Sequence, residues 1–112
     1  MQHTEVHKQF PNHVETLKEM DKLHPHKLKP EHVSHFNSAH IEIGRAAQLY
    51  REVFELKNEQ TNVVSHMSPE DKAQIPQQIK QKMNEIEEHL EAAKAKLEKI
   101  PADQRKEAQR FW

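Results

Sequence analysis

The most regular feature of the chain is a pair of apolar rows between about residues 31 and 67, in which residues recur three and four positions apart. The first row contains Val33, Phe36, His40, Ile43, Ala47, Tyr50 and Phe54. The second row, beside it in the later half, contains Ala46, Leu49, Val53, Leu56, Gln60, Val63 and Met67. This spacing places each row on one face of a helix, and two rows indicate two neighbours. We therefore expect a long helix over about 31–67.

A narrower apolar row follows Pro76 and has the same alternating spacing. Its members are Ile79, Met83, Ile86, Leu90, Ala93, Leu97 and Ile100. Charged residues cover the rest of this segment, and about two apolar positions in seven are typical of coiled-coil-like packing. Ser68 and Pro69 offer an N-cap and a first helical residue. The pattern predicts a second long helix over about 69–100, interrupted or kinked near Pro76.

Two shorter helices complete the prediction. Val14, Leu17, Met20 and Leu23 recur every three residues and indicate a helix over about 12–23. Pro101 should separate a last helix over about 102–112 from the one before it. A single glycine, Gly44, disfavours the tight turns of a β-sheet.

The expected architecture is one all-α domain spanning residues 1–112, an elongated helical hairpin or three-helix bundle. A helix of 37 residues is about 55 Å long, whereas a compact domain of this size has a radius of gyration of about 13 Å. Two long helices and one short helix leave apolar surface uncovered. We expect self-association to cover it, and a dimer is the simplest form.

Composition narrows the function classes. Hydrophobic residues make up 34% of the chain and charged residues 31%, with 17 Lys and Arg against 18 Asp and Glu. This balance argues against a nucleic-acid surface, which needs clustered positive charge. No apolar run is long enough for a membrane span or a signal peptide, so we expect no membrane contact and a cytoplasmic protein by default. Export without a cleavable signal stays open.

Catalytic signatures are missing from the sequence. It has no cysteine, no glycine-rich phosphate loop and no zinc-protease motif. We therefore expect a non-enzymatic protein without a cofactor.

Histidine is the unusual component, because eight of the ten His residues lie among the first forty positions. His3 and His7 have i, i+4 spacing, and His32 and His35 have i, i+3 spacing, so each pair could grip a metal ion from one helix face. Solvated polar residues are the ordinary alternative. His40 belongs to the first row and is expected to be buried. A His-rich metal-binding or metal-responsive bundle is the second functional hypothesis.

The favoured hypothesis is a protein–protein interaction module, such as a small helical adaptor, inhibitor or chaperone, whose protein partner is unidentified. One candidate surface is the second row at Leu49, Val53, Leu56 and Val63, which could receive a partner helix. The other is the C-terminal end, where Arg105, Arg110, Phe111 and Trp112 combine the residue types that dominate binding hot spots. The ordinary alternative is that the row is buried by the N-terminal helix and that Trp112 folds back onto the bundle.

Overall fold

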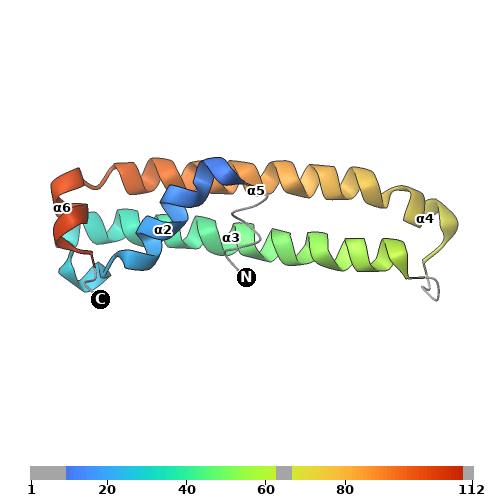
Figure 1. The fold of residues 1–112 in the computed structure, drawn as a ribbon, viewed down its shortest axis with the longest axis horizontal. Helices are drawn as coiled ribbons and strands as arrows, with labels where there is room; N and C mark the ends of the chain where they lie inside the picture. The colour runs from blue at the N-terminus through green and yellow to red at the C-terminus, as the bar shows by residue number, and fades with distance from the viewer. Residues whose placement is uncertain (1–9, 63–66, 110–112) are drawn as a thin grey trace.

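A computed structural model describes residues 10–62 and 67–109 (Figure 1). Four of the helices are longer than one turn and a half: α2 (Val14–Lys22), α3 (Pro30–Thr61), α5 (Ile75–Glu98) and α6 (Ala102–Glu107). Three shorter turns accompany them: η1 (Pro11–His13) precedes α2, η2 (Pro25–Lys27) lies between α2 and α3, and α4 (Pro69–Ala73) lies between α3 and α5. No strand occurs in these two segments, apart from a single bridge between Leu23 and Gln109. The expected all-α fold is confirmed.

Helices α3 and α5 form an antiparallel hairpin that runs the length of the molecule (Figure 1). The molecule measures 54 × 25 × 21 Å and its radius of gyration is 17.2 Å. A compact chain of this length would have a radius of about 13 Å. The elongated shape predicted from the length of the first long helix is therefore present.

The core is a narrow seam between the two long helices. α3 contributes Phe36, Ala39, Ala46 and Val53, and α5 contributes Ile75, Ile86, Leu90, Ala93 and Leu97, all of them buried. The alanines allow the helices to approach closely, and the branched residues fill the space between them. Full burial of one Ile or Leu side chain contributes about 1.5–3 kcal/mol, so Ile75, Ile86, Leu90 and Leu97 each stabilise the seam on this scale.

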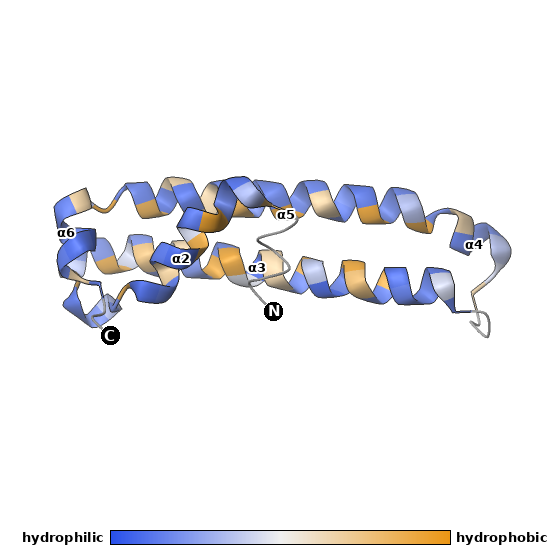
Figure 2. Ribbon diagram, viewed as in Figure 1, coloured by the Kyte–Doolittle hydropathy of each residue, from blue (hydrophilic) through white to orange (hydrophobic). Residues whose placement is uncertain are grey.

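Helix α2 adds a third layer over only one half of the hairpin (Figure 1). Phe10 and Leu17 join the buried cluster of Ala46, Ile86 and Leu90 near the middle of the hairpin. A second buried cluster lies at the end of the hairpin where α3 begins and α5 ends. It contains Met20, Leu23, Leu28, Phe36, Ala39, Ala93, Leu97, Ile100 and Ala108. Apolar residues, orange in Figure 2, continue along α3 beyond the part that α2 crosses.

The short helix α6 packs at the same end of the hairpin as α2. The Lys29 backbone N–H donates to the side-chain oxygen of the buried Gln104 at 2.7 Å. The His24 N–H donates to the Ala108 carbonyl at 2.8 Å. These bonds satisfy backbone groups where the chain enters α3 and leaves α6.

Two helix ends differ from the sequence prediction, and one of them is that of α6, which ends at Glu107 instead of near residue 112. α3 ends at Thr61 instead of near residue 67, because Gln60, Thr61 and Asn62 offer no apolar anchor, and the Thr61 hydroxyl lies within hydrogen-bonding distance of the Lys57 and Asn58 carbonyls. The second long segment divides at Gln74, close to the interruption predicted near Pro76. Pro76 lies in the first turn of α5, where its missing N–H costs nothing. Helix α3 continues through Gly44 without a break.

The predicted N-cap at Ser68 is present, since its hydroxyl accepts from the Asp71 N–H at 3.2 Å. In the described part of the chain, no helix combines the length and the apolar character needed to cross a membrane.

The close approach of α3 and α5 can be tested at one alanine. Ala93 is fully buried, and Ala95, on the same helix, is exposed. We expect Ala93→Leu to lower the free energy of unfolding by about 1–3 kcal/mol because the larger side chain overfills the seam. Ala95→Leu should change it by less than about 0.5 kcal/mol. Urea denaturation of both variants measures the difference, and equal effects would contradict the seam as described.

Candidate functional site

The two apolar rows of α3 have different neighbours. Val53 of the second row is buried, Leu49 is partly buried and packs with it, and Leu56 is also partly buried. The buried cluster that contains Val53 includes Ile86 and Leu90 of α5. The second row is therefore part of the seam, and in this arrangement Val53 is not available to a partner. Val63, predicted to extend this surface, lies outside the described residues.

The first row lies toward α2. Phe36, His40 and Ile43 line one side of a hollow of about 410 Å³, and residues of α2 and of the loop after it line the other. The residues of α2 and of this loop that line the hollow are Leu17, Met20, Asp21, Leu23 and Pro25. Helix α2 therefore rests loosely on α3. His40 is exposed instead of buried as predicted, and its ring stacks on Phe36 with the ring centres 6.3 Å apart.

The first row continues past α2 with Ala47, Tyr50 and Phe54, which we call the open row. Tyr50 packs partly against the seam, while Phe54 is 57% exposed. Ile79 and Met83 of α5 are also only partly buried. Covering Phe54 would remove its apolar surface from water, so the open row is a candidate interaction surface.

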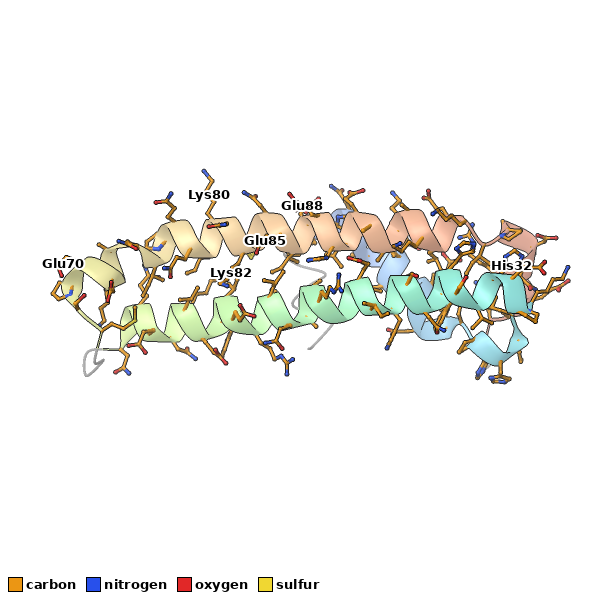
Figure 3. All side chains as sticks on the ribbon, turned by 180° about the vertical axis from the view of Figure 1, so that it is seen from behind. His32, Glu70, Lys80, Lys82, Glu85 and Glu88 are labelled. Carbon is orange, nitrogen blue, oxygen red and sulfur yellow. The ribbon has the colours of Figure 1, made fainter. Side chains whose placement is uncertain are left out.

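The other edge of the seam carries ion pairs between the two helices. Lys82 donates to Glu52 at 2.7 Å, and His89 Nδ1 lies 2.6 Å from a Glu42 carboxylate oxygen. Figure 3, drawn from the side opposite to that of Figure 1, shows Lys82 between α5 and α3 and Lys80 pointing away. One edge of the hairpin is therefore joined by charged side chains, and the other is apolar and half covered.

Glu52 is the group whose titration the ion pair alters. The hydrogen bond from Lys82, opposed by some desolvation and helped by the charge of Lys82, lowers the pKa of the Glu52 carboxyl. A lowered pKa in the folded state means that the pair stabilises the fold above the pKa of the unfolded chain. That contribution is lost as the pH falls through the folded pKa.

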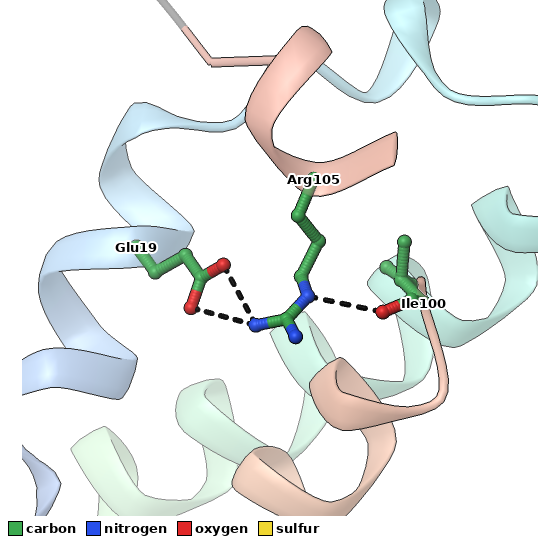
Figure 4. A network of polar contacts seen from close by, with 3 residues as sticks. All are labelled: Glu19, Ile100 and Arg105. Carbon is green, nitrogen blue, oxygen red and sulfur yellow. Dashed lines mark hydrogen bonds and ion pairs between the residues drawn. The ribbon is translucent and has the colours of Figure 1, made fainter. Parts of the chain in front are cut away.

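The C-terminal candidates are only partly described. Arg105 Nη1 donates to both carboxylate oxygens of Glu19, at 2.9 and 3.1 Å, and Arg105 Nε donates to the Ile100 carbonyl at 3.0 Å (Figure 4). Arg105 therefore ties α2 to α6, a structural role that uses its Nε and Nη1 donors. Arg110, Phe111 and Trp112 lie outside the described residues.

The predicted pair His32 and His35 is not part of a group of three or more ligands that could hold a metal ion in the described segments. The rings of His32 and His35 have centres 6.3 Å apart, and the carboxylate near His32 is that of Glu31 at 3.9 Å. His32 Nδ1 is buried without a partner. His3 and His7 lie outside the described residues.

A different histidine meets two carboxylates. His13, at the end of η1, is 1% exposed, and its Nε2 lies 3.1 Å from Glu87 and 3.4 Å from Glu91 of α5. Within residues 10–62 and 67–109, these three side chains form the group that could hold a metal ion. Sequence reasoning missed it, because Glu87 and Glu91 belong to the charged face of α5 and His13 is 74 residues from Glu87.

Compared with protein-family models, with curated proteins and with solved structures, the chain shows no significant match.

The Lys82–Glu52 pair gives a prediction about pH. Glu52→Gln should lower the free energy of unfolding at pH 7 by about 0.2–1 kcal/mol, the range for exposed ion pairs. The difference from the wild type should shrink as the pH is lowered below about 4, because both chains then lack the Glu52 charge. Urea denaturation across this range measures it. Glu55→Gln, at an exposed position of the same helix, is the control, and an equal loss in that variant would refute the role of the pair.

Proposed function

We propose that this chain is a non-enzymatic, cytoplasmic protein-binding module of the adaptor, inhibitor or chaperone type. In this proposal, an amphipathic helix of a protein partner lies along the open row of α3. The observation that carries the proposal is the exposure of Phe54 at the end of an apolar row whose other half is covered by α2.

Helix α2 indicates what kind of segment fits this edge. It is a short amphipathic helix that presents Leu17 and Met20 to the hairpin, and most of its charged residues are exposed. A partner helix with the same spacing of apolar residues could extend this third layer beside Ala47, Tyr50 and Phe54. Recognition of this kind, in which a helix docks its apolar face into a groove, recurs in many unrelated complexes.

The two edges of the hairpin differ in the groups that a bound partner would bury. The edge with Glu52, Lys82, Glu42 and His89 already has its charges paired between α3 and α5. Burying these groups under a partner would cost desolvation, whereas covering Phe54 removes apolar surface from water. The apolar edge is therefore the better docking surface.

A second copy of the chain is the alternative occupant of the open row. Two copies related by a two-fold axis would place one open row against the other, which is the self-association expected from the sequence. We favour a helix of another protein, and crosslinking at position 54 distinguishes it from a second copy of the chain.

Position 54 can be compared with a matched exposed position. Ile41 is 53% exposed on the same helix, so it reports what an exposed apolar residue does outside the open row. We expect a photo-crosslinking phenylalanine analogue at position 54, in cells that express the chain, to give a discrete adduct with another protein. The same analogue at position 41 should give none, and Phe54→Ser should leave the free energy of unfolding within about 0.5 kcal/mol of the wild type.

The mass of the adduct distinguishes a foreign partner from a second copy of the chain. An adduct of this chain with itself would show that a second copy fills the open row and would overturn the foreign-partner proposal. The same adducts at both positions, or none at position 54, would overturn the proposed surface altogether.

A further inference from the structure

The imidazole of His13 is buried at the junction of η1 and α5, with its Nε2 atom directed at two carboxylates. Glu87 and Glu91 stand one helical turn apart on α5, and both are more exposed than the ring between them, with Glu91 at 59%. The three ligand atoms all lie within 4.8 Å of one another. This cluster is separate from the open row of α3, and nothing in the proposed function uses it.

The two distances from the His13 ring to the carboxylates suit a tetrahedral metal site. Bonds of about 2.0–2.1 Å from a tetrahedral ion to nitrogen and oxygen place neighbouring ligand atoms about 3.3 Å apart. The Nε2 distances to Glu87 and Glu91 are 3.1 and 3.4 Å. The second of these is long for a hydrogen bond, whereas both suit the edges of one coordination tetrahedron.

The charges point in the same direction. Two carboxylates at i, i+4 spacing repel one another, and a neutral imidazole supplies one proton to only one of them. A divalent cation would neutralise both. One imidazole and two carboxylates form a donor set that suits Zn²⁺ and similar first-row ions.

We propose that His13, Glu87 and Glu91 bind a divalent transition-metal ion, for which Zn²⁺ is the probe, with water as the fourth ligand. The exposed side of the two carboxylates gives the ion and the water their access. The ion would fasten η1, and with it α2, to α5. Because it joins residues distant in the chain, its binding favours the folded state.

One feature limits the affinity of this site. Coordination through Nε2 leaves the proton on Nδ1, and His13 Nδ1 is buried without a partner. Metal-binding histidines usually donate this N–H to a carbonyl, carboxylate or water, and loss of such support typically weakens binding about 10–100-fold. We therefore expect weaker binding than in a zinc site with that support.

The test uses the full chain freed of metal and titrated with Zn²⁺. We expect binding of one ion that is lost in Glu87→Gln/Glu91→Gln, and a melting temperature that rises by about 10 °C at a concentration of one hundred times the Kd. Glu88→Gln, in which an exposed neighbour on the same helix loses its charge, should behave as the wild type. The double variant carries the test because His13 is in the core, where its replacement could prevent folding.

Co²⁺ provides a second measurement that depends on geometry. Four-coordinate Co²⁺ absorbs visible light far more strongly than the hydrated ion, so the wild type and Glu88→Gln should develop this absorption and the double variant should not. Equal Zn²⁺ stabilisation in the double variant would overturn the site, because the ion would then be held by other histidines. Failure of the folded wild type to bind Zn²⁺ would overturn it as well. Neither outcome bears on crosslinking at position 54.

Discussion

The packing of α3 against α5 is the contact to which every other described helix attaches. It depends on size: Ala39, Ala46 and Ala93 keep the backbones close, and Ile86, Leu90 and Leu97 fill the remaining space. A chain with so many charged residues cannot build a thick core, so its apolar side chains are concentrated along this one seam. Helices α2 and α6 then close one end of it.

The two edges of the seam have different chemistry, and this asymmetry is what gives the molecule a surface to offer. Lys82 with Glu52 and His89 with Glu42 join the helices along one edge. Along the other edge, α2 covers the first row of α3 near Phe36 and Ile43, and the row continues to the exposed Phe54. An incomplete third layer of this kind can be completed by another helix, which is the basis of the proposed function.

Periodicity predicted the helices well because helix formation is local, and α2, α3 and α5 lie where their apolar rows occur. It could not decide which neighbour each row would meet: Val53 packs in the seam, and the continuous first row ends in an exposed Phe54. The predicted end of α3 lies about six residues beyond the observed one, because the apolar pattern through Met67 outweighed the polar residues around Thr61. The cluster of His13, Glu87 and Glu91 depends on the packing of η1 against α5, so the spacing of residues within η1 or within α5 does not predict it.

Helix α2 packs against only one half of the hairpin, and we expect that half to be the more stable. Amide hydrogen exchange, resolved by residue, tests it most directly because exchange reports local opening. We expect slower exchange in α3 between about residues 36 and 46 and in α5 between about residues 86 and 97, where α2 packs, than in residues 50–61 and 77–84. Equal protection along both helices, or stronger protection in the half beyond α2, would contradict it.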